Sequence, residues 1–381
     1  MITQCASRQT GVALLAALVL VMTVVIIMGN IFYRHQINVA QTALSLHQDQ
    51  ANLLALGAES WARQLLEDDD PKYDHFDEIW AQAIPAMPVE GGLINGCISD
   101  LQGRFNLNNF FKYTNSLQLR NELNNNNIAG FAKVWHYLLN LQEIPVFPGR
   151  VASIIDWVDK KSILISVDGA EHDEYAGLMP PRMVGDGPMV EPSELAAVMG
   201  YEIFEVQQLM PWITALPITT PSSLTPTATK ININTASDEL LLALGGTTYD
   251  LQFRDAVVAG RPFEKIDDFH TQIDTELALT PNAATRWPNT LVDIKSEYFQ
   301  LYIEVILGEA RIEVNSIIRR SGGKLDIISR DLTTVPVSIE KNSTSVLFEK
   351  LASTAGFGSD NEVEEAMDNR QVQPACLMIG A

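Results

Sequence analysis

Acidic side chains crowd one short stretch of the chain, and their chemistry is that of a cation site. The stretch contains, in order, Asp156, Asp159, Asp168, Glu171, Asp173 and Glu174. Carboxylate oxygens are the hard ligands that Ca²⁺ takes in proteins, and Gly169 would let the backbone turn between them. The spacing does not match an EF-hand loop, so no fixed register can be assigned. Composition therefore leaves two interpretations open, a calcium site and a solvated acidic loop, of which the second is the commoner.

Other signs of chemistry are sparse. The chain contains no G-x-S-x-G elbow, Walker loop, H-E-x-x-H or G-x-G-x-x-G pattern. Its six histidines are scattered, and only His172 lies beside other candidate ligands. Because Ca²⁺ prefers oxygen, we expect His172 to be solvated rather than bound to a metal. We therefore predict that the protein is not an enzyme.

Residues 231–275 resemble a helix-hairpin-helix module, through the strings INTASDELLLALGG and RPFEKIDDF. In DNA-binding versions, a glycine-rich hairpin presents backbone N–H groups to phosphate. This segment holds eight acidic residues against three basic ones. That balance would repel a phosphate backbone, so we predict a helical packing unit that binds no nucleic acid. Asn234 and Thr235 are expected to cap the helix that follows.

The composition of the whole chain bounds its class. The 381 residues are enough for an anchor and two domains, and 46% apolar residues suffice for a sizeable core. A net charge of −21 disfavours nucleic acid, which needs a concentrated basic face. Three cysteines are too few for a disulfide scaffold. Cys5 lies in a predicted leader, which leaves Cys97 and Cys376 as a pair that would bridge in an oxidising compartment and tie the tail to the body.

The elements that must position these residues begin with an apolar N-terminal run. Residues Val12–Tyr33 carry no charge, and at helical rise they span about 30 Å, the thickness of a bilayer core. A short polar leader, MITQCASRQTG, precedes the run, and no A-x-A-like site follows it, which argues against a secretory signal peptide. Hydropathy alone leaves a plain single-span anchor as an alternative.

The leader supports a sharper interpretation. Its basic polar character, its closing Gly11 and the apolar helix that starts at Val12 resemble a prepilin leader, which a peptidase at the cytoplasmic face cleaves between these two residues. Pilin-like proteins usually carry a glutamate at the fifth mature position, where it neutralises a neighbour's N-terminal amine in the apolar filament core. That position is Ala16 here. A subunit without the carboxylate fits best at a filament end, where no neighbour has to be matched.

Beyond the span, the pattern predicts a continuing helix and an antiparallel sheet. The helix extends to about Leu66, where the string DDDP follows it, and its apolar stripe consists of Leu54, Ala58, Trp61 and Leu65. Strand signals occur in residues 91–106 and again in residues 292–331, where apolar and polar positions alternate between turn residues. The two regions are expected to form one antiparallel meander completed by the early strand.

Helical patterns separate the two strand regions, at residues 128–141, 149–159, 192–210 and 236–245. The segment 216–228, rich in Pro, Thr and Ser, is expected to be an exposed loop. The predicted segments are a leader (1–11), a transmembrane and spine helix (12–67), the first part of a pilin-like domain (68–109), an inserted helical domain (110–290), the second part of the sheet (291–334) and a polar acidic tail (335–381). The fold class is α+β: a pilin-like long helix packed on an antiparallel sheet, with a large, mainly α-helical domain inserted.

Several strings, in order, are similar to those of the general secretion pathway protein K family, the large minor pseudopilins of type II secretion. They are GRFNLNN (103–109), DWVD (156–159), DGAE (168–171) and ININTA (231–236). The resemblance covers residues 1 to about 332 and includes the missing glutamate. It implies calcium binding in the inserted domain. We expect Asp168, Glu171 and Asp173 to provide most of the ligands, with Asp156 and Asp159 as further candidates.

The resemblance also implies a structural role. Such a subunit sits at the tip of the pseudopilus, beside the I-class and J-class minor pseudopilins and above the major pseudopilin, and it supports the export of folded proteins. Prepilin peptidase would process the leader, the new N-terminus would be methylated, and the secretin and exoproteins are further candidate partners. The chain would be a single-pass protein of the bacterial inner membrane with its body in the periplasm. A periplasmic binding or enzymatic domain on an inner-membrane anchor remains the alternative.

Overall fold

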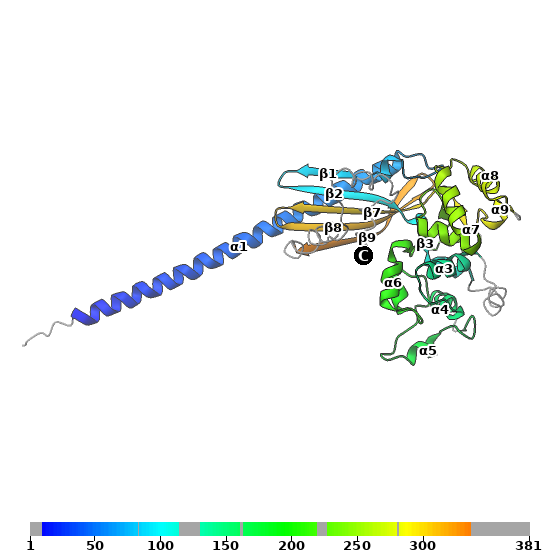
Figure 1. Cartoon of the computed structure of the whole chain (residues 1–381). Helices are drawn as coiled ribbons and strands as arrows, with labels where there is room; N and C mark the ends of the chain where they lie inside the picture. Colours follow the sequence, from blue (N-terminus) through cyan, green and yellow to red (C-terminus); the bar gives the residue numbers. More distant parts are fainter. Residues whose placement is uncertain are drawn as a thin grey trace, which may run out of the picture.

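The structure of the chain is a computed structural model, which describes residues 10–82, 84–113, 130–160, 163–218, 227–279 and 282–336. It has three parts (Figure 1): a long N-terminal helix, a five-stranded sheet along the second half of that helix, and a mainly helical region at the far end of the sheet. The helical region lies in the sequence between the second and third strands of the sheet. The predicted α+β layout is therefore confirmed.

Helix α1 (Thr10–Glu67) is 58 residues long, about 87 Å at helical rise. Among the described residues it is the one helix with the length and composition to cross a membrane, and its most apolar window has a mean hydropathy of 2.7 and no buried residue. Large apolar side chains from Leu14 to Tyr33 are exposed. Such a surface is unfavourable in water and suited to lipid or to the core of a filament.

The sheet is antiparallel throughout. Its strands, in spatial order, are β1 (Ile84–Val89), β2 (Gly92–Asp100), β7 (Tyr298–Leu307), β8 (Ala310–Ser321) and β9 (Lys324–Pro336). The turn between β8 and β9 consists of Gly322 and Gly323, both at positive φ, which a hairpin this tight favours. The predicted meander and its early partner strand are confirmed.

The face of α1 that packs on the sheet differs from the predicted stripe. The buried side chains of this face include Ala51, Ala55, Ala62 and Leu66. Trp61, which was predicted to face the sheet, is 42% exposed, and the other three predicted positions are partly buried. Alanines on the contact line let the helix axis approach the sheet, and the larger side chains flank that line. A prediction based on bulky apolar residues therefore places the buried face of α1 on the side next to the one that contacts the sheet.

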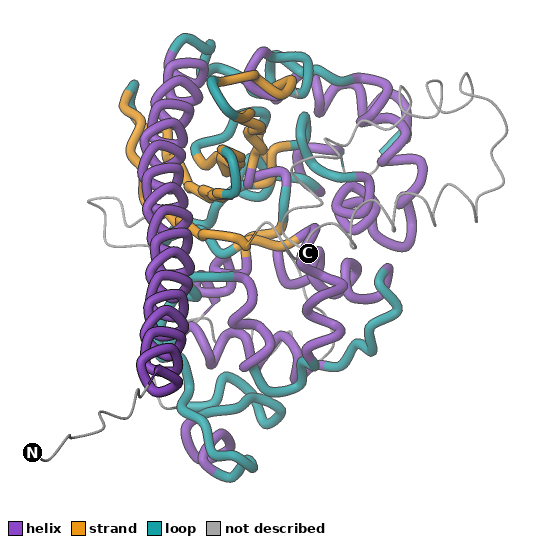
Figure 2. The backbone as a smooth tube through the Cα atoms, turned by 90° about the vertical axis from the view of Figure 1, so that its left-hand side faces the viewer, coloured by secondary structure: helices purple, strands orange, loops and turns teal. Residues whose placement is uncertain are grey.

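The inserted region is built from short helices around one apolar core. They are α3 (Gly130–Leu141), α4 (Pro148–Val158), α5 (His172–Ala176), α6 (Ile203–Leu209), α7 (Asp238–Gly260), α8 (Ile266–Leu277) and α9 (Ala283–Arg286). Buried aromatic side chains such as Phe105, Trp135 and Phe269 belong to this core. Figure 2 shows the region standing to one side of α1 rather than around it.

Two helix predictions need correction. The predicted helix at 192–210 is divided into a 3₁₀ turn, η4 (Pro192–Ala197), and α6, because Gly200 between them has a φ of 92°. The predicted helix at 236–245 forms only the first part of α7, which continues to Gly260. Gly246 interrupts α7 with a φ of 66° and a ψ of −172°, so the axis kinks at the glycine pair that the hairpin motif contains.

The predicted caps of α7 are also wrong. Ser237 is the N-cap, and its side chain accepts a hydrogen bond from the Leu240 N–H at 3.2 Å. Asn234 instead lies in the core, where its amide exchanges two hydrogen bonds of 2.9 Å with the backbone of Phe263. The Thr235 hydroxyl donates to the carboxylate of Asp100, at the end of β2. Both residues fasten the inserted region rather than start its helix.

Two short parallel strand pairs complete the region: β3 (Phe105–Asn106) with β4 (Ile213–Thr214), and β5 (Ile231–Asn232) with β6 (Val292–Asp293). The predicted loop at 216–228 lies outside the described residues over 219–226, as does the tail beyond Pro336.

Candidate functional site

The acidic loop folds around the carboxylate of Asp156, near the end of α4. This fully buried group accepts hydrogen bonds from the Ile165 N–H at 2.9 Å and from the Ala170 N–H at 3.0 Å. A Cβ atom at Gly169 would lie 2.0 Å from an Asp156 carboxylate oxygen, so only glycine fits there. The acid at position 156 and the glycine at position 169 are therefore both explained by the shape of this loop.

Glu171 is the unsatisfied group of this loop. Its side chain is buried and faces the Glu174 N–H as the N-cap of α5, but neither carboxylate oxygen makes a well-aligned hydrogen bond with a described residue. Burial, and after it the neighbouring charges of Asp156, Asp159, Asp186 and Glu174, together raise the pKa of Glu171 to about 7. Burial likewise raises the pKa of Asp156 to about 7. A buried carboxylate that lacks a well-aligned donor and is surrounded by other acids is suited to a cation.

The structure separates the predicted ligands into two groups. Asp156, Asp159 and Glu171 are buried, whereas Asp168 and Asp173 are exposed. The ligand role of all five stays a prediction. Sequence reasoning missed Asp186, whose negative charge helps to raise the pKa of Glu171. Asp186 has a positive φ of 49°. Its signal was the string Gly-Asp-Gly, a turn that can bring an acid back towards the loop.

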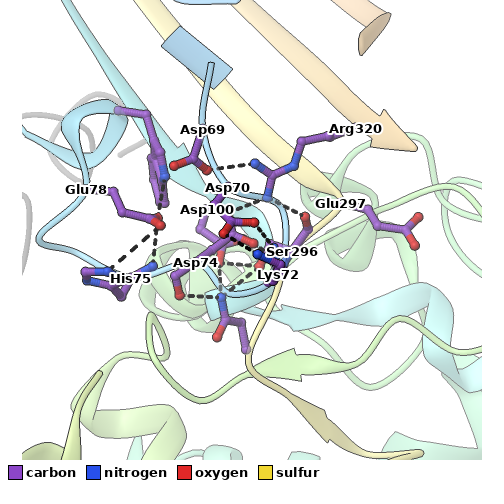
Figure 3. Close-up of polar contacts among 12 residues, drawn as sticks. Asp69, Asp70, Lys72, Asp74, His75, Glu78, Asp100, Ser296, Glu297 and Arg320 are labelled. Carbon is purple, nitrogen blue, oxygen red and sulfur yellow. Dashed lines mark hydrogen bonds and ion pairs between the residues drawn. The ribbon is translucent and has the colours of Figure 1, made fainter. Parts of the chain in front are cut away.

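Outside the acidic loop, the described residues include one group of three acids whose carboxylate oxygens lie within 4.8 Å of one another. Asp69, Asp74 and Glu78 form this group at the far end of α1 (Figure 3). The guanidinium of Arg320 on β8 already supplies a positive charge there, with Nη1 2.8 Å from an Asp69 oxygen and Nη2 bound to Asp74. An arginine in this position makes the cluster an ion-pair network rather than a metal site.

The same junction holds the inserted region to the sheet. Asp100, at the end of β2, is buried and accepts hydrogen bonds from the Thr235 and Ser296 hydroxyls, both at 2.5 Å, and from the Asn232 amide at 3.0 Å. Burial raises the pKa of the Asp100 carboxyl. Asp74 accepts from the Ser296 N–H at 2.7 Å (Figure 3). Sequence reasoning missed this network, because its members are far apart in the chain.

The remaining predicted residues lie at the ends of the described chain. Gly11 and Val12 fall in the first turn of α1, and residues 1–9 lie outside the described residues. The Ala16 side chain is exposed on the apolar part of the helix. Cys97 on β2 is disulfide-bonded and 3% exposed. Its predicted partner, Cys376, lies outside the described residues, so that pairing stays a prediction.

Comparison with known proteins decides the family. Two family models, both described as type II secretion system (T2SS), protein K, match residues 103–218 and 231–286. The type II secretion system protein K of Pectobacterium carotovorum subsp. carotovorum is 30% identical over 332 residues, which cover 85% of this chain and 96% of that protein. The chain belongs to the type II secretion system protein K family. The protein K of Aeromonas hydrophila is 28% identical over 338 residues, covering 85% of this chain and 97% of that protein.

A solved structure supports the fold of this chain. It is the crystal structure of the GspK-GspI-GspJ complex from the enterotoxigenic Escherichia coli type 2 secretion system, and the match has a TM-score of 0.63 and 23% identity. It covers 77% of this chain and 99% of that chain. The relatives are named as components of a secretion system. The apolar N-terminal helix of this chain is consistent with a single-pass membrane anchor.

Proposed function

We propose that this chain is the minor pseudopilin at the tip of the type II secretion pseudopilus, where it starts and caps filament assembly and supports the export of folded proteins. The observation that carries the proposal is the position of the inserted region. It stands at the far end of the sheet from the N-terminus of α1, to one side of the helix (Figures 1 and 2). A shaft subunit stacked above it would collide with this bulk, whereas a subunit at the end has free space there.

The apolar half of α1 supports the same position. In a filament, this half leaves the bilayer and joins the apolar core, where an unpaired charge is costly. The exposed Ala16 offers no carboxylate to a neighbouring N-terminal amine. A subunit with one of its axial neighbours missing avoids that unmatched pairing. Cleavage between Gly11 and Val12 by prepilin peptidase, followed by N-methylation, is part of the proposal.

The proposed partners follow from the assembly. The similar Escherichia coli protein was solved with GspI and GspJ, so we propose the I-class and J-class minor pseudopilins as direct neighbours of this chain. The major pseudopilin would lie beneath them, and the secretin and exoproteins are further candidate contacts. The chain would span the inner membrane once before assembly, with its body in the periplasm.

Co-purification tests the proposed assembly. The full chain, extracted in detergent and carrying an affinity tag, is expected to retain I-class and J-class subunits from the same organism in equimolar amounts. The major pseudopilin, expressed at the same level, is the matched control and should be retained in smaller amounts. Recovery of the tagged chain alone, in detergents that keep the I-class and J-class subunits soluble, would contradict the assembly.

The acidic loop supports a calcium proposal for the same protein. The residues fit the ion, because the buried Glu171 oxygens lack a well-aligned protein donor and the surrounding charges are acidic. We propose Glu171 as the central ligand, with Asp159, Asp168, Asp173 and Asp186 as further acidic candidates in the same part of the chain. Asp156 keeps the loop in shape through its two backbone hydrogen bonds. A bound Ca²⁺ would offset the mutual repulsion of these acids and so stabilise the loop.

A further inference from the structure

The inserted region contains a cavity that neither the filament role nor the acidic loop uses. Its volume is about 480 Å³, and it lies between α3, the kink in α7 and the end of α9. The walls include apolar side chains such as Val134, Trp287 and Leu291, and the hydroxyls of Thr247, Thr248 and Thr285. A cavity of this size can hold a few side chains of a peptide, and the polar groups of its wall would fix their orientation.

The charge of this cavity is opposite to that of the chain. Three basic side chains line it, those of Lys112, Lys133 and Arg286, and no described lining residue is acidic. The whole chain has 47 acidic residues against 26 lysines and arginines. A concentration of one sign in a concave, partly apolar site creates a local positive potential that attracts anions. The cavity is therefore a basic site in an acidic protein.

The walls of the cavity are held by contacts of their own. The Trp287 indole N–H donates to the Leu244 carbonyl at 2.9 Å, and its ring stacks on Phe253 with the centroids 4.2 Å apart. A Cβ atom at Gly246 would lie 2.8 Å from the Tyr137 ring, so the kinked backbone sits directly against α3. The Tyr113 hydroxyl accepts from the Phe131 N–H at 3.1 Å. The site is therefore formed before any ligand arrives.

The kink adds backbone donors to the basic side chains. Because Gly246 is not helical, the helix starts again at Thr247 and runs on to Gly260. The first N–H groups of a helix lack partners within it, and its N-terminus carries a partial positive charge. Both threonines of this new first turn line the cavity. Lysine ammonium groups, hydroxyls and amide N–H groups together form a donor set for an oxyanion.

We propose that this cavity binds a carboxylate of an acidic peptide segment from a partner polypeptide. The apolar walls suit the aliphatic parts of such a segment, and the lysines suit its acidic side chains. A nucleic acid is excluded by the net charge of −21, which repels a long polyanion even though the cavity itself is basic. The inference stands apart from the proposed role at the tip.

Calorimetry on the full chain in detergent tests the inference. The probe is a blocked tetrapeptide of sequence Leu-Asp-Glu-Leu, compared with the neutral Leu-Asn-Gln-Leu and with inorganic phosphate. We expect the acidic peptide to bind more tightly than both of the others. The double substitution Lys112→Gln and Lys133→Gln should weaken its binding by about tenfold, because each exposed ion pair contributes up to ~1 kcal/mol.

The matched control is Lys324→Gln, at the first residue of β9 and outside the cavity. It should leave the affinity of the acidic peptide unchanged. Both lysines of the cavity are exposed, so the double variant should keep its melting temperature. Equal binding of the acidic and neutral peptides, tighter binding of phosphate, equal affinity in the double variant, or no binding of any probe would each overturn the proposal.

Discussion

Arg330 on β9 holds the carboxylate of Glu59 on α1, with Nε 3.1 Å from one oxygen and Nη2 2.5 Å from the other. Glu59 is 3% exposed and lies on the face of α1 that packs on the sheet. The Ser316 hydroxyl on β8 also donates to it, at 2.6 Å. This buried charge joins the spine helix to the strand at the edge of the sheet, so the pair fixes how the last strand lies against the helix.

Removing this arginine should cost more than removing the cation of a fully solvated pair, because its partner Glu59 is buried. Arg330→Ala leaves Glu59 buried with the serine as its main donor, and we expect a loss of about 2 kcal/mol in the free energy of unfolding. Lys72→Ala, whose ion pair with Asp70 is exposed on both sides, is the matched control and should leave the free energy of unfolding nearly unchanged. The measurement is denaturant unfolding followed by tryptophan fluorescence.

A double substitution separates the charge from the packing. Glu59→Leu with Arg330→Met removes both charges and fills similar volume, so it should be more stable than Arg330→Ala alone. If the double variant were as unstable as the sum of the two single variants, the pair would not act as one unit.

Glu78 predicts a pH dependence of stability. Burial, together with the charges of Asp69 and Asp74, raises the pKa of its carboxyl from 4.5 to about 7. The folded state therefore binds more protons than the unfolded state between these two values, and stability falls as pH rises through 7. Between pH 5 and pH 8 the contribution is about 2 kcal/mol. Glu78→Gln keeps an acceptor for the Trp80 indole, and it should flatten this slope.

The pH measurement needs a neighbour for comparison. Asp77→Asn changes an adjacent carboxylate whose side chain is 83% exposed, and it should leave the slope as in the unchanged chain. Unfolding is followed at each pH in saturating Ca²⁺, so that the acidic loop stays in one state. Parallel pH slopes for the Glu78 variant and the unchanged chain would contradict the assignment.

The acidic loop predicts a calcium-dependent gain in stability. Ca²⁺ at 100 times its dissociation constant should stabilise the folded chain by about 2.7 kcal/mol, and chelation should remove that gain. Glu171→Gln should abolish calcium uptake in calorimetry, because its buried oxygens lack a well-aligned protein donor and the substitution removes their charge. Asp173→Asn changes an exposed carboxylate and should weaken uptake by a few-fold at most. Uptake that Glu171→Gln leaves intact would disprove the proposed central ligand.

A feature can be predicted from the sequence when the residues that interact lie close together along the chain. The leader pattern, which includes Gly11 and Ala16 and whose processing stays a prediction, depends on neighbouring residues. The alternation that predicts β7 is equally local. Arg320 and Asp74 are 246 residues apart, and no local pattern joins them. The sequence showed six acids near residue 171 but could not tell Asp156, which two backbone N–H groups hold, from Glu171, whose oxygens lack a well-aligned hydrogen bond. That distinction depends on which backbone N–H groups reach each carboxylate.

The stripe on α1 illustrates a second limit. Periodicity locates an apolar face, and it selected Trp61 because tryptophan is large and apolar. The sheet selects Ala55 and Ala62 instead, because a close approach of helix and sheet excludes bulky side chains from the contact line. Side-chain volume at an interface depends on the shape of the partner, which a single helix pattern does not contain.

The mature N-terminus distinguishes a processed subunit from a plain anchor. We expect the intact mass of the purified chain to lack residues 1–11 and to include one methyl group on the Val12 amine. Gly11→Leu should block the cleavage, because a bulky residue replaces the small one before the apolar helix, whereas Ser7→Ala within the leader should be processed normally. A retained Met1 in the unchanged chain would favour the single-span anchor.

The position of the chain in the assembled pseudopilus tests the central claim most directly. Gold-labelled antibodies against the inserted region, applied to isolated pseudopili, give that position by electron microscopy. The account predicts gold at one end of each filament, with the shaft unlabelled, while antibodies against the major pseudopilin label the shaft. Gold distributed along the shaft, or filaments that form at normal number and length and carry no gold in a strain that produces this chain, would contradict it.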